Sequence, residues 1–276
     1  MERIKIDGTP TRVSISHQSK GNQWKWAQNG KWYKVDCFGY EGLAEVVVSE
    51  FLKSSNLSKD GYVVYKPCII EYKGREHFGC VSDDFLQDGE ELITLEKYYK
   101  SYTSFSLAKV LGNISEVKER ELHTVEFFER VAGIEDFGVE LTKIIEVDTF
   151  FLNEDRHTNN IAILCGKRNR LAPIFDCGAA LFSDVRYTFL EKYGYEECLE
   201  RFKAKPFTED RDLQLDVAES LYGDHLRFGI KKNDIMEYIE EIVMRYNFRE
   251  SYGENVIKRI EETVIMQARK YSWMFE

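Results

Sequence analysis

The first third of the chain alternates between apolar and polar residues in short runs, which is the pattern of half-buried strands. One longer stretch breaks this alternation: Leu43, Val47 and Phe51 recur at the spacing of a single helix face and predict a helix over Gly39–Asn56. Turn residues punctuate the runs, as in Lys73-Gly74. The predicted strands are Arg12–Ser16, Gln23–Ala27, Lys31–Cys37, Tyr62–Tyr72 and Arg75–Ser82.

The rest of the chain has mainly helical periodicity, interrupted by one apolar hairpin. Amphipathic helices are predicted at Glu116–Val131 and Val139–Leu152, and helical periodicity returns from Asp212 to the last helix, Glu254–Met274. Between them, Ile161–Cys165 and Leu171–Phe175 predict two strands around a basic turn. We therefore expect an α+β protein with two lobes, a β-rich lobe at 1–85 and a mainly helical lobe at 86–276.

Composition narrows the class of protein. The chain has 276 residues, 43% of them hydrophobic, which is enough for a folded core. A net charge of −10 and the lack of a concentrated basic patch argue against contact with nucleic acid. We find no apolar run long enough to span a membrane and no signal peptide, so we expect a cytoplasmic protein. Six cysteines without a Cys-x-x-Cys pair support neither a zinc site nor a disulfide framework.

The strongest chemical signal lies around the predicted hairpin. Asp155 follows the end of a predicted helix, Asn160 comes five residues later, and Asp176 follows the second hairpin strand. An antiparallel hairpin would bring Asp176 beside Asn160. The carboxylate of Asp155 can accept a proton from an attacking hydroxyl, while Asn160 and Asp176 offer the hard oxygen ligands that Mg²⁺ prefers. This set predicts an ATP-dependent phosphotransferase with Asp155 as catalytic base and Asn160 and Asp176 as metal ligands.

The residues around Asp155 indicate a family. In Asp155-Arg156-His157, arginine and histidine follow the aspartate, whereas ordinary protein kinases place them before it. This segment resembles the catalytic loop of phosphatidylinositol kinases and of HipA-like bacterial serine/threonine kinases, including CtkA-type proteins. Phe175-Asp176-Cys177-Gly178 is similar to their magnesium-binding Asp-x-Gly segment. The resemblance implies a two-lobed kinase fold, ATP and Mg²⁺ as cofactors, and autophosphorylation. We interpret His157 as an organiser of the loop.

The resemblance extends to the β-rich lobe. Gly21-Asn22-Gln23-Trp24-Lys25 is similar to the Gly-x-Gln-x-Lys stretch behind the phosphate-covering loop of HipA-like kinases, which implies nucleotide contacts for Gly21, Gln23 and Lys25. Lys34 lies on a predicted strand among apolar residues, where an ammonium needs a counter-ion or a ligand. We expect it to contact ATP phosphates and to pair with Glu45, with Glu50 as the alternative partner.

The resemblance to HipA-like kinases also implies roles for three further segments. Gly79–Phe85 connects the lobes, where an adenine ring would be hydrogen-bonded by the backbone. Gly178–Thr188 occupies the place of an activation segment, and the basic stretch Lys203–Phe207 follows on the expected substrate side. The hydroxyl groups that the activation segment offers for autophosphorylation are those of Ser183, Tyr187 and Thr188.

Taken together, these patterns predict a serine/threonine protein kinase whose substrate is another protein or the chain itself. Two alternatives remain open. One is a small-molecule or lipid kinase on the same scaffold, although the acidic net charge argues against an anionic membrane as its partner. The other is a nucleotide-binding, toxin-like regulatory module with little catalysis. Whether a separate antitoxin-like partner exists is also open.

Overall fold

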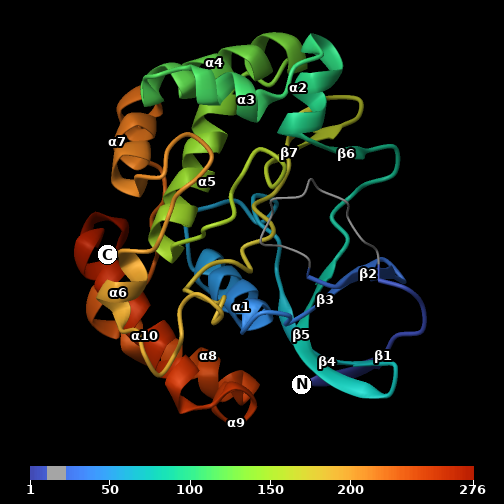
Figure 1. The fold of residues 1–276 in the computed structure, drawn as a ribbon, viewed down its shortest axis with the longest axis vertical. Coiled ribbons are helices and arrows are strands. Elements are labelled where there is room, and N and C mark those ends of the chain that lie inside the picture. The colour runs from blue at the N-terminus through green and yellow to red at the C-terminus, as the bar shows by residue number, and fades with distance from the viewer. Residues whose placement is uncertain (11–22) are drawn as a thin grey trace.

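The N-terminal lobe is built on a five-stranded sheet. The computed structural model describes residues 1–10 and 23–276; the predicted strand Arg12–Ser16 and Gly21 lie outside this range. The strand order is β1-β4-β5-β3-β2, antiparallel except where β1 runs parallel to β4 (Figure 1). The strands are β1 (Glu2–Lys5), β2 (Lys25–Gln28), β3 (Lys31–Val35), β4 (Lys66–Tyr72) and β5 (Arg75–Asp83).

Helix α1 (Glu41–Lys53) is buried almost all round. The sequence predicts one apolar face, but α1 lies between the N-terminal sheet and the C-terminal helices and is covered on both sides (Figure 1). Its close approach to the sheet needs glycine, because a Cβ on Gly42 would lie 2.7 Å from the carbonyl carbon of Gly79 on β5. Consequently even the glutamates of this helix are buried: Glu41, Glu45 and Glu50.

The C-terminal lobe is mainly helical, so the predicted α+β organisation with two lobes is confirmed. The predicted division after residue 85 falls between β5 and β6 (Glu91–Thr94). Two long helices, α4 (Val117–Ala132) and α5 (Phe137–Phe151), lie where the periodicity predicts them. The other helices are α2 (Leu95–Thr103), α3 (Leu107–Asn113), α6 (Tyr195–Leu199), α7 (Arg211–Tyr222), α8 (Ile235–Tyr246), α9 (Phe248–Tyr252) and α10 (Glu254–Lys270), with short 3₁₀ turns at Lys232–Asp234 and Ser272–Met274.

The central hairpin is shorter than the sequence predicts. Strand β7 (Ala162–Cys165) pairs with β6 on one side and with β8 on the other, but β8 covers only Arg170–Leu171. Beyond it, Ile174 leaves the hairpin and forms a parallel bridge with Tyr62, which the sequence assigns to the start of β4. The chain therefore changes partner before it reaches Asp176 and ties the two lobes together there.

Both ends of α1 are fastened to the C-terminal helices. At its start, Asp36 accepts hydrogen bonds from the Gly42 amide and from the Tyr252 hydroxyl of α9. Towards its end, the buried Glu50 carboxylate accepts bonds from Arg245 at 3.0 Å and Tyr246 at 2.8 Å, both on α8. The C-terminal helices thus fix the position of a helix in the other lobe.

One buried carboxylate in the C-terminal lobe has no such partner. Glu121 on α4 is 1% exposed, and its Oε1 atom has no hydrogen-bond partner in the described part of the chain. Burial raises the pKa of Glu121 to about 8, because the charged form is poorly solvated. The folded state therefore keeps a proton that the unfolded chain releases above pH 4.5. Folding stability contributed by this group is lost as pH rises from about 4.5 to about 8.

Replacing Glu121 with glutamine should remove this pH dependence. We expect Glu121→Gln to gain stability relative to the wild type as pH increases from 5 to 8.5, by on the order of a few kcal/mol, because an amide cannot ionise. Chemical denaturation at both pH values measures the effect. Glu126→Gln, at an exposed position of the same helix, is the matched control. An identical pH dependence in Glu121→Gln and the wild type would contradict the prediction.

Candidate active site

Lys34 lies at the centre of the site, buried between two carboxylates. Its Nζ atom is 2.5 Å from Glu45 Oε1 on α1 and 2.9 Å from Asp176 Oδ1 beyond the hairpin. Burial alone would lower the pKa of Lys34, but Asp176 and Glu45 outweigh it and raise the pKa well above its usual value. The lysine is therefore held as a cation. Its partner on α1 is Glu45, whereas the alternative, Glu50, binds α8 instead.

Asp176 also binds a second lysine. Lys25 Nζ on β2 lies 3.0 Å from Asp176 Oδ1 and 2.8 Å from Oδ2. Burial acts to raise the pKa of Asp176, but Lys25 and Lys34 together hold it well below its ordinary value. Two adjacent strands of the N-terminal sheet thus bring two lysines to one ionised carboxylate from a segment more than 140 residues later. Two ammonium groups beside it form a site that suits phosphate oxygens as well.

The backbone directs Asp176 into this position. Asp176 has φ of +60°, in the left-handed region that aspartate tolerates better than most residues. The next amide, of Cys177, donates a 2.9 Å hydrogen bond to Glu45 Oε2. The carboxylate of Glu45 therefore binds Lys34 with one oxygen and the segment of Asp176 with the other, which couples α1 to β3 and to this segment.

Asp155 lies in the loop after α5, and contacts hold it from several sides. Leu152, with φ of +55°, caps the end of α5. The side-chain oxygen of Asn153 then accepts a hydrogen bond from the Asp155 amide at 3.2 Å. Asn160 Nδ2 donates to the Asp155 carbonyl at 2.7 Å and lies 3.3 Å from Oδ2. This leaves the amide oxygen of Asn160 for another ligand. Asp155 and Asn160 therefore form one local unit, as their spacing predicts.

Two basic groups face the same carboxylate. His157 Nε2 lies 3.7 Å from Asp155 Oδ1, and Lys205 Nζ lies 3.2 Å from it. Burial lowers the pKa of His157, the Asp155 carboxylate opposes this, and Lys205 lowers it further. The imidazole is accordingly neutral at pH 7. The sequence places Lys205 in a basic stretch, and no local spacing relates this lysine to Asp155, fifty residues earlier in the chain.

Arg156 holds the loop of Asp155 from the interior of the protein. It is 1% exposed and forms a two-pronged ion pair with Asp148 on α5, with Nε–Oδ2 at 2.6 Å and Nη2–Oδ1 at 3.0 Å. Its Nη1 atom donates to the carbonyl oxygens of Asn160 at 2.9 Å and Phe175 at 2.7 Å. One guanidinium thus joins the segment of Asn160 to the segment of Asp176. The sequence marked Arg156 as a family signature but gave no indication of Asp148.

The predicted nucleotide-binding stretch is described only in part. Gly21 lies outside the described residues, and Gln23 is half-buried, with no hydrogen-bond partner for its Nε2 within residues 1–10 and 23–276. Lys25 reaches the site through Asp176. The structure therefore brings together Lys25, Lys34, Glu45 and Asp176 on one side, and Asp155 and Asn160 on the other, with Arg156 between them.

The segment 178–188, which the sequence predicts to be an activation segment, is mostly buried in this structure. Ser183 and Thr188 are buried, and their hydroxyls donate to backbone carbonyls within the segment. The guanidinium of Arg259 on α10 donates to the carbonyls of Thr188 and Tyr193. Tyr187, in contrast, is 53% exposed. Of the three hydroxyls predicted as phosphate acceptors, two are thus inaccessible in this conformation.

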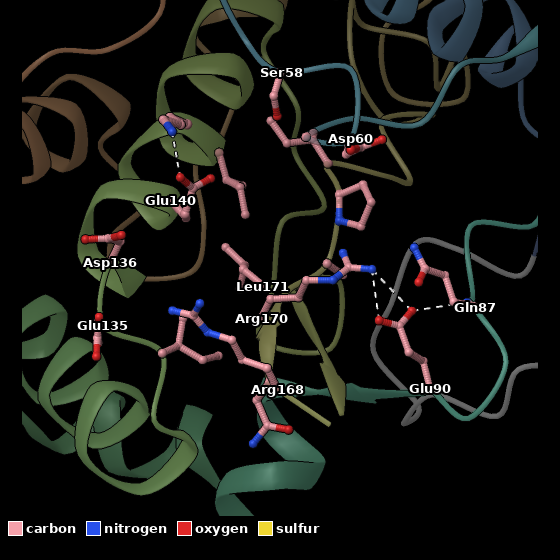
Figure 2. A pocket seen from close by; sticks show the side chains of 18 of the residues that line it. Ser58, Asp60, Gln87, Glu90, Glu135, Asp136, Glu140, Arg168, Arg170 and Leu171 are labelled. Atoms are coloured by element: carbon pink, nitrogen blue, oxygen red, sulfur yellow. Dashed lines mark hydrogen bonds and ion pairs between the residues drawn. The ribbon is translucent and has the colours of Figure 1, made fainter. Parts of the chain in front are cut away.

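A cavity of about 740 Å³ lies beside the β7–β8 turn and the loop between α4 and α5 (Figure 2). None of the predicted site residues lines it. Its charged side chains are partly paired with each other: Arg170 with Glu90, and Lys143 with Glu140. This cavity is therefore distinct from the site around Lys34 and Asp155.

Comparison with known proteins agrees with the fold that the sequence motifs imply. No protein-family model and no curated protein sequence matches the chain. Among solved structures, the proinflammatory kinase CtkA of Helicobacter pylori matches over 93% of this chain and 94% of its own, with a TM-score of 0.55 and 16% identity. HipA of the Shewanella oneidensis MR-1 toxin–antitoxin system, solved with HipB and operator DNA, covers 97% of this chain and 67% of its own, with a TM-score of 0.49 and 12% identity. The chain therefore has a kinase-like fold similar to that of CtkA.

Proposed function

We propose that this chain is an ATP- and Mg²⁺-dependent phosphotransferase, and more specifically a serine/threonine protein kinase of the HipA and CtkA type that can phosphorylate itself. The observation that carries the proposal is the buried Lys34 between Glu45 and Asp176. A lysine paired with a helix carboxylate and aimed at a second carboxylate at the exit of a hairpin is the arrangement that kinases use to hold nucleotide phosphates. The kinase-like fold supports the same reading.

In this proposal the chain's own residues act by charge and position. Lys34 and Lys25 bind phosphate oxygens of ATP, exchanging part of their contact with Asp176 for the ligand. Asp155 accepts the proton of the attacking hydroxyl, whose oxygen forms the new bond to the γ-phosphorus. The bond from that phosphorus to the bridging oxygen breaks, and its electron pair remains on ADP. Alignment and charge neutralisation provide most of the rate enhancement.

The residues present fit a magnesium ion. Asp176 offers carboxylate oxygens and Asn160 an amide oxygen, which are hard donors. No group of three or more His, Cys, Asp or Glu side chains placed to hold a metal occurs in the described residues, so phosphate oxygens and water would complete the shell. When bound, Mg²⁺ would neutralise phosphate charge. Both lysines bind Asp176 in this structure, which keeps the carboxylate paired.

The proposed acceptor is a protein hydroxyl, on another protein or on the chain itself. The acidic net charge disfavours an anionic membrane surface as a partner. No helix in the described part of the chain has the length and apolar character needed to cross a membrane. Because Ser183 and Thr188 are buried, an acceptor within the chain has to be another hydroxyl or requires the activation segment to open.

Incubation of the purified protein with γ-labelled ATP and Mg²⁺ tests the proposal directly. We expect label on the chain or on an added protein, and no label when Mg²⁺ is chelated. Transfer only to an added lipid or metabolite would instead indicate a small-molecule or lipid kinase. Nucleotide binding without transfer to any acceptor would indicate a regulatory module and would exclude a kinase.

Replacing Asp176 with asparagine should separate nucleotide binding from transfer. We expect Asp176→Asn to lose phosphoryl transfer by about 100-fold or more, because a metal ligand is removed. Binding of metal-free ATP should not weaken, since Lys25 and Lys34 remain and lose their competing carboxylate. Label transfer and nucleotide titration measure the two effects. Asp88→Asn, at an exposed loop position, is the control, and undiminished transfer by Asp176→Asn would exclude this site.

Replacing Asp155 with asparagine should affect the chemical step alone. We expect ATP affinity to be retained, because the phosphate-binding lysines lie on the other side of the site, while turnover decreases by about two orders of magnitude through loss of the base. Single-turnover transfer at saturating ATP measures the rate. A variant that transfers phosphate at the wild-type rate would show that Asp155 is not the base.

A further inference from the structure

A lysine from a distant segment reaches the carboxylate of Asp155. Lys205 lies in the loop between α6 and α7, and its Nζ atom is 3.2 Å from Asp155 Oδ1. The Lys205 side chain is 34% exposed and the Asp155 side chain 9%, so the lysine covers the open side of the carboxylate. An acceptor hydroxyl has to reach Asp155, so Lys205 lies beside the carboxylate that the acceptor would contact.

The backbone of this loop is held in place by a buried glutamine. Gln214 on α7 is 1% exposed; its Nε2 atom donates to the Lys205 carbonyl at 2.9 Å and its Oε1 atom accepts from the Phe207 amide at 3.0 Å. Arg120 on α4 donates to the Phe207 carbonyl at 2.5 Å. The helix α7 that carries Gln214 also packs on α5, which leads into the loop of Asp155. Lys205 and Asp155 are thus supported by the same pair of helices.

The neighbouring lysine has different surroundings. Lys203, two residues earlier, pairs with Glu209 at 2.7 Å, and both side chains are more than 60% exposed. Such a surface pair contributes little to stability or to the site. The contact of Lys205 with Asp155 is therefore a specific feature of this position and does not follow from the basic composition of the loop.

The two oxygens of the Asp155 carboxylate are held differently. Oδ2 lies 3.3 Å from the amide nitrogen of Asn160, and Oδ1 faces the ammonium of Lys205. A carboxylate fixed at both oxygens keeps a single orientation toward an incoming hydroxyl. The ammonium also offsets the repulsion between this carboxylate and the anionic phosphates of a nucleotide.

We propose that Lys205 is a positioning residue of the phosphoryl transfer: its ammonium holds the base Asp155 in orientation on the acceptor side and reduces the negative charge there. This inference rests on the proposed phosphotransferase function. The lysine takes no part in bond exchange. The acceptor proton passes to Asp155, the acceptor oxygen bonds to the γ-phosphorus, and the electron pair of the broken bond stays on ADP.

Four variants test this role: Lys205→Met, Lys205→Gln, Lys205→Arg and the control Lys203→Met. The readout is single-turnover loss of the γ-phosphoryl group from labelled ATP with Mg²⁺, counting label on the protein and label released to water, so that no acceptor need be known. ATP affinity and thermal melting are measured on the same samples. Asp155→Asn serves as the reference for loss of the base.

We expect Lys205→Met and Lys205→Gln to slow transfer by about 10- to 100-fold at saturating ATP, the scale of a misplaced catalytic group, with ATP affinity and melting unchanged. Lys205→Arg should recover most of the rate, because it keeps the positive charge. Lys203→Met should behave as the wild type.

Two results would overturn the inference alone. One is wild-type transfer by Lys205→Met and Lys205→Gln while Asp155→Asn is impaired. The other is weakened ATP binding by these Lys205 variants, which would place the lysine on the nucleotide. Lack of transfer by the wild type itself would reject the phosphotransferase function, and the role of Lys205 with it.

Discussion

The site depends first on a buried ion cluster, in which Lys34 lies between Glu45 and Asp176. A buried ammonium without partners is strongly unfavourable, so the fold has to bring two carboxylates to it. One comes from α1 in the N-terminal lobe and the other from the segment beyond the β7–β8 hairpin in the C-terminal lobe. The electrostatic requirement of one lysine therefore links the two lobes at this point, and the pair from Lys25 adds strand β2 to the same cluster.

The C-terminal half of the site depends on a second buried pair, between Arg156 and Asp148. Breaking such a pair leaves an unpaired charge in the core, whereas the intact pair satisfies two N–H donors of the guanidinium with one carboxylate. Since the same guanidinium binds the carbonyls of Asn160 and of Phe175, which precedes Asp176, it connects the backbone segments of the two predicted metal ligands. In the order Asp-Arg-His, the arginine binds Asp148 in the core, while the carboxylate of Asp155 before it faces Asn160 and Lys205.

Local sequence patterns were sufficient to predict many of the helices and strands and part of the candidate site. The helices α4 and α5 and the strands β3 and β5 have clear periodicity, and the spacing of Asp155 and Asn160 lies within one loop. Elements whose stability comes from distant partners were missed. Strand β1 has four residues and pairs in parallel with β4, about 65 positions away, and β6 is equally short. The same holds for Lys205 and Asp148, whose roles depend on contacts that no local spacing reveals. Strand β8 was predicted too long because Ile174 is apolar, but it pairs with Tyr62 instead.

The attachment of α1 to the C-terminal helices has a consequence for how the site could be controlled. Asp36 is joined to Tyr252, 216 positions later in the chain, and Glu50 is joined to Arg245 and Tyr246. A displacement of α1 that would withdraw Glu45 from Lys34 has to break these contacts at both ends of the helix together. The helices α8 and α9 are thus connected to Lys34 through α1, so a substitution at Tyr252 or Arg245 acts on the same helix that carries Glu45.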